Sequence, residues 1–308
     1  MSKSAFLRNV ISLAVVAGLA VVTSLAHVGW GASSIPVPQN QSTGEWTASV
    51  KDSGGINLSF ERRSEKGHRN RTGQTYDFAD LQGLTREQAV SGGPVRFSLV
   101  REAGTIDCEG TFQNGKGSGT FRFTANQSFI SAMKSRGFDF EESTKSGSHS
   151  EDRLFAATTL NVTTALADDL TSAGFGKLGV DDLFKAAIFK IDSRFMREMK
   201  ASGFADMGME DLVKARIFKI DPTFVSQVSQ MGFDKEPFES LVKMRIFKVT
   251  PEFVAEVRNE GLTDLAIEDL VKLQIFKIDS EFIRQARAEG VPLEVEKLVQ
   301  RRIGVGRN

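Results

Sequence analysis

Apolar residues in the C-terminal part of the chain recur with a period of 29 residues. One landmark of this period is the tripeptide Ile-Phe-Lys, which begins at Ile188, Ile217, Ile246 and Ile275. A second landmark is a series of glycines at the same spacing: Gly174, Gly203, Gly232, Gly261 and Gly290. Gly137 opens this series 37 residues earlier, so the first copy would carry an eight-residue insertion. Two landmarks with one period predict a tandem array of six structural repeats over residues 125–308.

The pattern inside each repeat predicts two short helices. The first helix starts at an N-cap residue, which in successive copies is Asp192, Asp221, Thr250 and Asp279. Apolar residues three and seven positions after the cap lie one turn apart on one face. The glycine then ends the helix, because a residue without a Cβ adopts the left-handed conformation easily. We expect the residue after the glycine to pack on the residue five positions earlier, as in Phe204 on Met199 and Phe233 on Val228.

The second helix has apolar residues at positions i, i+3, i+4 and i+8, as in Met209, Leu212, Val213 and Ile217. This spacing predicts one apolar face. A helix of about ten residues is only marginally stable alone, whereas stacked helical hairpins bury each other's apolar faces. The repeats therefore predict an α-solenoid.

Residues 44–124 follow a different pattern, in which apolar and polar residues alternate as they do in half-buried strands. Val95 to Val100 is one such run. Asn114-Gly115 lies between two others and is a hairpin turn signal, and a second hairpin is expected between Trp46 and Phe60. We expect an antiparallel sheet of five or six strands. The fold class is therefore α+β: a small antiparallel β-sheet domain followed by an α-solenoid of helical-hairpin repeats.

The N-terminal segment is typical of an export signal. Lys3 and Arg8 precede an apolar stretch from Val10 to Leu25, and Ser24-Leu25-Ala26 offers small residues for cleavage. We expect a signal peptide over residues 1–26 and a disordered linker over residues 27–43, in a periplasmic or secreted protein. The alternative is a retained membrane anchor, although the apolar stretch is short for a membrane span.

Charged residues form two rows in the repeats. The first row is Lys185, Lys214, Lys243 and Lys272, with an acidic residue four positions earlier in each copy: Asp181, Glu210, Glu239 and Glu268. This spacing predicts an ion pair within each helix, and a basic ladder for an anionic polymer is the alternative. The second row is Lys190, Lys219, Lys248 and Lys277, which has no acidic partner at helical spacing. Together with Arg216 and Arg245, this second row is the candidate interaction surface.

The basic residues of one loop in the β domain support a second hypothesis. They are Arg62, Arg63, Lys66, His68, Arg69 and Arg71. Such a cluster could bind an anionic glycan or phosphate, and a solvated loop between strands is the competing interpretation. This loop supports the alternative hypothesis that the protein is a ligand- or glycan-binding sensor that acts through its N-terminal β domain.

Composition narrows the possible chemistry. Lys plus Arg and Asp plus Glu are both 39, so we expect no nucleic acid as partner. The single cysteine, Cys108, shares a strand face with apolar residues and is expected to be buried. Two histidines would remain after signal cleavage, too few for the usual zinc sites. No hydrolase, metalloprotease or nucleotide-binding motif is present, so we expect no cofactor, no metal and no enzymatic activity.

The stretch from Leu241 to Val254 resembles an uncharacterised bacterial repeat whose usual form is Leu-x-x-x-Arg-Ile-His-Gly-Val-Thr-Pro-Glu-Phe-Ile. Such repeats occur in exported proteins and at the C-terminal ends of membrane sensor-transducer metallopeptidases related to β-lactam sensors. Residues 97–129 resemble the segment that precedes those repeats, so the resemblance covers roughly residues 95–305. This chain has Phe247 and Lys248 where the family has His-Gly, and it has no peptidase domain. The resemblance therefore implies no protease activity and supplies no ligand.

These observations predict an exported, non-enzymatic interaction module. Its helical repeats would bind another protein or an anionic envelope component. A membrane would be contacted only through the signal segment, if that segment is not cleaved.

Overall fold

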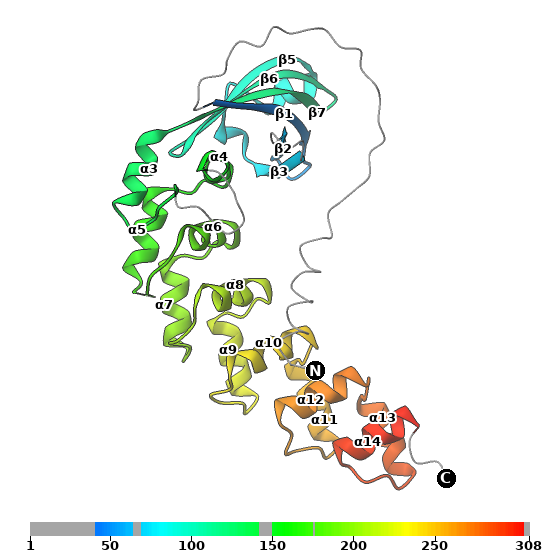
Figure 1. Ribbon diagram of the computed structural model, residues 1–308. Helices are drawn as coiled ribbons and strands as arrows, with labels where there is room; N and C mark the ends of the chain where they lie inside the picture. The colour runs from blue at the N-terminus through cyan, green and yellow to red at the C-terminus, as the bar shows by residue number, and fades with distance from the viewer. Residues whose placement is uncertain (1–40, 64–68, 142–149, 175, 305–308) are drawn as a thin grey trace. The chain divides into compact units, whose positions relative to one another are not determined.

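A computed structural model describes residues 41–63, 69–141, 150–174 and 176–304 (Figure 1). The expected signal peptide and residues 27–40 of the expected linker lie outside the described residues, as do His27, His68 and His149. Residues 41–43 were expected in the linker and instead form the start of the first strand, because their backbone pairs with the strand around Phe123.

The N-terminal part of the described chain is a seven-stranded antiparallel sheet, one strand more than the largest number expected. Its strands are β1 (Gln41–Val50), β2 (Ile56–Arg63), β3 (Arg69–Tyr76), β4 (Leu81–Gln82), β5 (Gly93–Arg101), β6 (Gly104–Gln113) and β7 (Lys116–Ala125). Their order across the sheet is β3-β2-β1-β7-β6-β5-β4. Strand β3 was not predicted because it lies at the edge, where of its eight side chains only Tyr76 is buried. An edge strand of this kind lacks the apolar alternation by which strands are recognised.

Both predicted hairpins are confirmed. Strand β1 pairs with β2, and β6 pairs with β7. The second hairpin turns at Asn114 and Gly115, whose φ angles are 49° and 73°. Two positive φ angles in a two-residue loop define the turn that suits the twist of paired strands.

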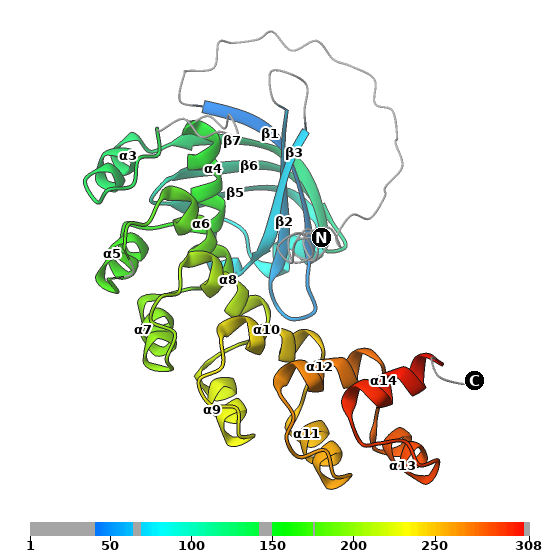
Figure 2. The same cartoon turned by 60° about the horizontal axis from the view of Figure 1, so that its bottom comes forward.

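The chain after the sheet forms helices in pairs, and the α+β class is confirmed. The twelve helices within the described residues from 127 onward are α3 (Gln127–Lys134), α4 (Ser150–Leu160), α5 (Thr164–Ser172), α6 (Val180–Phe189), α7 (Ser193–Ala201), α8 (Met209–Ile217), α9 (Pro222–Gln230), α10 (Phe238–Ile246), α11 (Pro251–Asn259), α12 (Ile267–Ile275), α13 (Ser280–Ala288) and α14 (Val295–Ile303). They make six pairs, one for each expected repeat. Figures 1 and 2 show the first helices in one row and the second helices in a neighbouring row.

The signals that start and end the first helices behave as predicted. The backbone N–H of Phe195 donates to the Asp192 carboxylate at 2.8 Å, and the N–H of Phe224 donates to Asp221 at 2.9 Å. At the other end, Gly232 has a φ of +89° and the N–H of Phe233 donates to the carbonyl of Val228 at 3.2 Å. This is the hydrogen bond that defines the Schellman motif.

The second helix of the first pair, α4, packs on the sheet. It contacts β3, β5, β6 and β7. Phe155 of α4 is buried, with its ring centroid 5.5 Å from that of Phe121, and edge-on to Phe60 and Phe123. The expected boundary between residues 124 and 125 therefore does not separate two cores: one buried cluster runs from the sheet into the helices.

No helix among the described residues has both the length and the apolar character needed to cross a membrane.

A small helix, α2 (Arg86–Ser91), precedes strand β5, and its Ala89 is fully buried.

Candidate interaction surface

The four lysines of the second row share an unusual backbone conformation. Lys190, Lys219, Lys248 and Lys277 have φ angles of 53°, 54°, 55° and 52°. Each follows the last turn of a second helix, and the residue after it closes the helix with a Schellman hydrogen bond, for example from the N–H of Ile220 to the carbonyl of Ala215 at 2.8 Å. A side chain in this left-handed conformation costs about 1 kcal/mol, because its Cβ approaches the following carbonyl. Glycine occupies the corresponding position in every first helix and avoids this cost.

The lysine row, Lys190, Lys219, Lys248 and Lys277, is exposed to solvent. Within the part of the chain that the structure describes, these side chains form no ion pair and no side-chain hydrogen bond. Four cations are thus held at backbone positions that favour glycine, without an internal electrostatic gain.

The other lysine row is paired, but not as predicted. Lys185 lies 2.5 Å from Glu210, and Lys214 lies 2.6 Å from Glu239. Lys243 pairs in the same way with Glu268, and Lys272 with Glu296. The expected i, i+4 pairs within each helix, such as Asp181 with Lys185, are wrong, because the first turn of the next second helix brings its glutamate closer. Lys185 and Lys214 do have a second, longer pair within their own helices, with Asp182 and Asp211 at 3.5 Å. These lysines link neighbouring repeats and offer no free basic ladder.

Arg216 and Arg245, expected in the interaction surface, also join neighbouring repeats. Arg216 donates through Nη2 to the carbonyl of Lys190 at 2.7 Å, and its guanidinium lies 3.7 Å over the ring of Phe195. Arg245 makes the same contacts one repeat later, to the carbonyl of Lys219 at 2.8 Å and over Phe224 at 3.6 Å. Burial lowers the pKa of Arg245, which the charge of Asp221 opposes. Both arginines satisfy carbonyls at helix ends, so the candidate surface narrows to the four lysines.

Gln274 continues this arrangement. Its Nε2 donates to the carbonyl of Lys248 at 3.1 Å. The turns that carry the lysine row are therefore tied to each other, one repeat to the next, and lie side by side.

Three of the four isoleucines that lie two residues before a lysine of the row are exposed, which the apolar pattern did not predict; the fourth, Ile246, is partly buried. The exposed fraction is 52% for Ile188, 39% for Ile217 and 49% for Ile275. At roughly 100° per residue, Ile217 lies about 40° beyond Val213 around the helix. The buried arc runs the other way, through Leu212 to the fully buried Ala215. We call the three exposed isoleucines together with the lysine row the Ile–Lys stripe.

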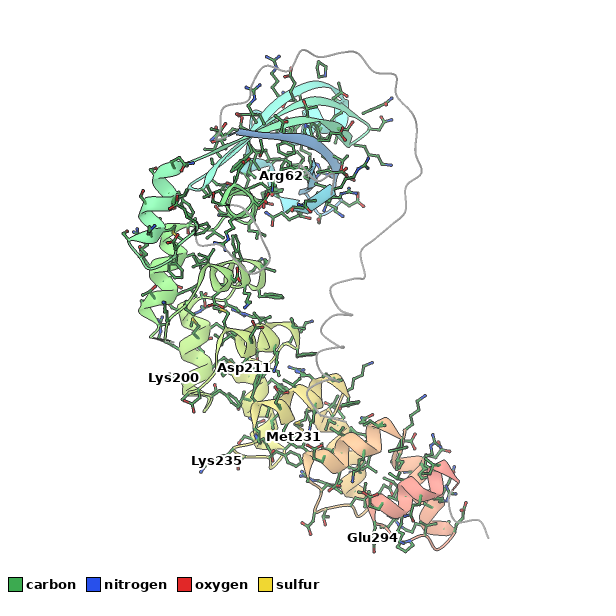
Figure 3. The ribbon with its side chains drawn as sticks, viewed as in Figure 1. Arg62, Lys200, Asp211, Met231, Lys235 and Glu294 are labelled. Carbon is green, nitrogen blue, oxygen red and sulfur yellow. The ribbon has the colours of Figure 1, made fainter. Side chains whose placement is uncertain are left out.

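Several basic residues of the β-domain loop make contacts with other parts of the protein. Arg62, which is labelled in Figure 3, lies 2.6 Å from Asp152 of α4, and its guanidinium lies 4.1 Å over the ring of Phe155. Arg69 lies 3.4 Å from Glu61, and Arg71 donates to the Thr47 hydroxyl at 3.3 Å. Lys66, His68 and the side chain of Arg63 lie outside the described residues. Arg62 therefore holds α4 on the sheet.

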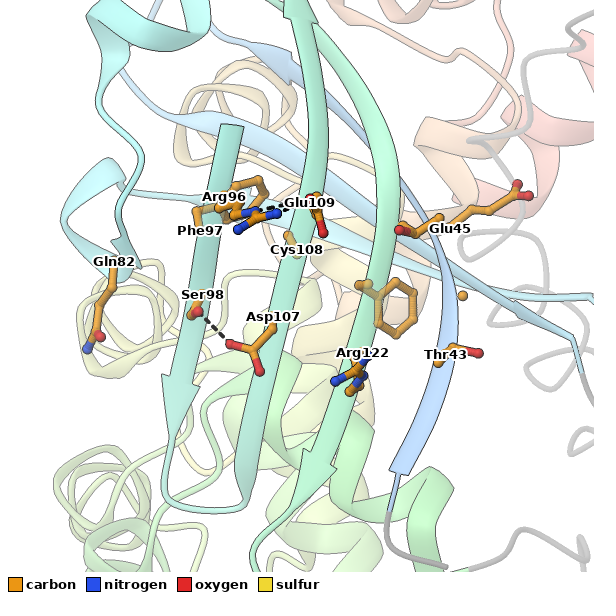
Figure 4. A pocket seen from close by; sticks show the side chains of 13 residues that line it. Thr43, Glu45, Gln82, Arg96, Phe97, Ser98, Asp107, Cys108, Glu109 and Arg122 are labelled. Carbon is orange, nitrogen blue, oxygen red and sulfur yellow. Dashed lines mark hydrogen bonds and ion pairs between the residues drawn. The ribbon is translucent and has the colours of Figure 1, made fainter. Parts of the chain in front are cut away.

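An open depression of about 860 Å³ lies on the sheet (Figure 4). Arg96 pairs with Glu109 at 2.7 Å across neighbouring strands, and the Ser98 hydroxyl donates to Asp107 at 2.6 Å. These polar groups partner each other, and no tyrosine or tryptophan lines the depression. Cys108 is buried as predicted, and burial, reinforced by the charge of Asp107, raises the pKa of its thiol. A thiol with a raised pKa is a poor nucleophile.

No group of three or more His, Cys, Asp or Glu side chains within the described ranges is arranged to hold a metal ion. The chain matches no protein-family model and no curated protein. The resemblance of residues 95–305 to an exported bacterial repeat therefore stays an expectation.

The backbone cost of the lysine row can be measured at Lys219. We expect Lys219→Gly to raise the free energy of unfolding by about 1 kcal/mol relative to Lys219→Ala, since both remove the charge and only glycine relieves the left-handed strain. Urea unfolding of the two variants measures the difference. An alanine variant as stable as the glycine variant would contradict a strained backbone at this position.

Proposed function

We propose that this protein is a non-enzymatic interaction module that binds an anionic, extended partner through the lysine row. The observation that carries the proposal is that four exposed lysines occupy left-handed positions and have no carboxylate partner among the described residues. Their charges contribute nothing to the pairing between repeats, which the other lysine row provides.

The physical basis is repeated weak attraction. Second helices that pack against each other lie roughly 8–10 Å apart, so the row offers one cation per helix width. A single exposed ion pair contributes little. Several pairs made at once to one partner add up, because after the first contact the others form within the same complex. An extended anion that spans several repeats gains from this arrangement, and a small anion does not.

The proposed location is the periplasm or the exterior of the cell. It rests on the signal-like pattern of residues 1–26 and on the resemblance of the repeats to exported proteins. The partner would then be another exported protein or an anionic component of the envelope.

The test removes the row without disturbing the backbone. We expect replacement of Lys190, Lys219, Lys248 and Lys277 together by glycine to weaken binding of poly-L-glutamate by at least about tenfold at low salt. Glycine suits the left-handed positions, so circular dichroism should be unchanged. Wild-type binding should also weaken as salt screens the charges.

A matched control variant removes four positive charges elsewhere on the surface, so that its net charge changes by the same amount. Lys116, Lys177, Lys200 and Lys297 are exposed and lie outside the row, Lys200 at the end of the first helix α7 (Figure 3). Their replacement by glutamine should reduce binding by less than about twofold. Equal losses in the two variants would show that only net charge matters and would refute a specific role for the row.

The alternative is a sensor that binds its ligand through the β domain. Its main support was the basic loop, from which Arg62 is engaged with α4. The exposed Arg69 and Arg71 offer the discriminating variant. Loss of poly-L-glutamate binding in Arg69→Gln/Arg71→Gln, with the lysine row intact, would favour the β domain.

A further inference from the structure

We infer that the partner is an extended acidic polypeptide with a carboxylate at every third residue and aliphatic side chains between the carboxylates, bound along the Ile–Lys stripe. This inference rests on the proposed function and names the class of its partner.

The isoleucines indicate a partner with apolar side chains. Ile188, Ile217 and Ile275 are each two residues before a lysine of the row and are about half exposed. Isolated exposed apolar residues are common on protein surfaces. An exposed isoleucine two residues before an exposed lysine recurs in three of the four repeats and forms an amphipathic strip, which is interrupted at the partly buried Ile246. Covering the strip with aliphatic side chains would remove apolar surface from water while the lysines meet carboxylates.

An acidic polysaccharide would bind the lysines of this strip but would leave its isoleucines uncovered. It supplies carboxylates but no aliphatic side chains to cover the isoleucines. Sugar rings also pack well on tyrosine and tryptophan, which have an apolar body and a polar group. Neither residue type occurs in the stripe, and the described members of these types, Trp46 and Tyr76, are buried in the sheet.

An anionic membrane surface fits less well because an aspartate follows three of the four lysines two residues later in the sequence. Asp192, Asp221 and Asp279 cap the next helix two residues after a lysine of the row. A continuous layer of anionic headgroups would be repelled by these carboxylates. A polypeptide with one carboxylate per repeat can place its charge on the lysine alone.

The spacing of the row predicts the sequence period of the partner. Hydrogen bonds from Arg216, Arg245 and Gln274 join each turn of the row to the turn of the preceding repeat, so we expect successive lysines to lie about one helix width apart. That width is roughly 8–10 Å. A polyproline II segment has three residues per turn and rises about 3.1 Å per residue, so one face recurs every 9 Å or so. A carboxylate at every third residue therefore meets each lysine in turn.

The experiment uses protein purified from cells that express the full chain. The probe is a fluorescent peptide with four copies of Glu-Pro-Leu, and the control peptide has the same composition with its glutamates consecutive. We expect fluorescence anisotropy to show about tenfold tighter binding of the periodic peptide, because only its carboxylates match the row. Vesicles of phosphatidylglycerol and poly-L-glutamate serve as the other anionic probes.

A variant separates the apolar contribution from the charges. Ile188→Ser, Ile217→Ser and Ile275→Ser together leave the lysines in place, and these exposed positions tolerate serine. We expect about fivefold weaker binding of the periodic peptide and less than about twofold change for poly-L-glutamate.

The possible outcomes distinguish this inference from the proposed function. Equal affinity for the two peptides, an unaffected serine variant or tighter binding to vesicles than to the periodic peptide would overturn the inference. If poly-L-glutamate still binds through the lysine row in those cases, the proposed function stands. If none of the anionic probes binds, both fail.

Discussion

Replacing Phe155 by alanine is expected to lower the free energy of unfolding by about 3–5 kcal/mol, the range for a buried aromatic residue. Its ring is buried among Phe60, Phe121 and Phe123 and lies under the guanidinium of Arg62. The alanine variant would leave a cavity between α4 and the sheet. Arg62 would lose its aromatic contact while its ion pair to Asp152 remained.

Urea unfolding gives the size of this effect, and amide hydrogen exchange shows where it acts. Because one buried cluster joins the sheet to the helices, amides of both β7 and α4 should exchange faster in the variant. Phe218→Ala, at a partly buried position in the turn after α8, is the control and should cost much less. If exchange rises in α4 while β7 keeps its protection, the sheet and the first repeat are separate cooperative units.

The second large effect is expected at Gly232. Its φ of +89° places it in the left-handed region, where a β-branched side chain is strongly disfavoured. A Cβ at this position would meet only the end of the Arg258 side chain, at 3.7 Å. The cost of Gly232→Val is therefore a backbone cost, about 2 kcal/mol or more.

Gly208 provides the matched control for this substitution. It precedes α8 with a φ of −86°, and a Cβ there would have no neighbour within 4 Å. Gly208→Val should cost less than about 1 kcal/mol, which is the size of a lost preference at a helix start. Similar destabilisation of the two variants in urea would show that the left-handed backbone at Gly232 contributes nothing special.

The helical repeats were predictable because their signals act over short distances in the sequence. Asp221 and Gly232 bound one helix, and the hydrogen bonds that identify them as cap and terminator connect residues three to five positions apart. Such contacts depend on the local backbone alone. The period of the pattern then repeats the same local structure along the chain.

The contacts between repeats were not predictable in this way. Lys214 has an acid four residues before it on its own helix, yet its shortest ion pair, at 2.6 Å, is with Glu239, which lies 25 residues later, and its second is with Asp211 at i−3. The choice depends on how two helices pack, and the sequence alone does not specify that geometry. The placement of α4 on the sheet was missed for the same reason, since Arg62 and Asp152 are 90 residues apart.

Some properties of the candidate surface depend on the local sequence, and others depend on how neighbouring repeats pack. The exposure of Lys219 follows from its place in a turn, which is a local property. The role of Arg245 depends on the distance from its guanidinium to the preceding repeat. Ile217 was assigned to the core because the i+8 position is close to the apolar face, and only the packed structure shows where the buried arc ends.

Helix α14 differs from the second helices before it at one buried position. Arg301 of α14 stands at the position that Leu273, Met244 and Ala215 occupy in preceding second helices, where all three are fully buried. Arg301 instead donates through Nε to Glu289 at 2.8 Å, so α14 has a charged side chain where the second helices before it have a buried apolar one. Internal units recur every 29 residues, and Arg216 and Arg245 make the same contacts to the preceding unit in two of them. Recombination between two of them would lengthen or shorten the protein by whole units of 29 residues. The reach of the protein along a partner would then change in discrete steps.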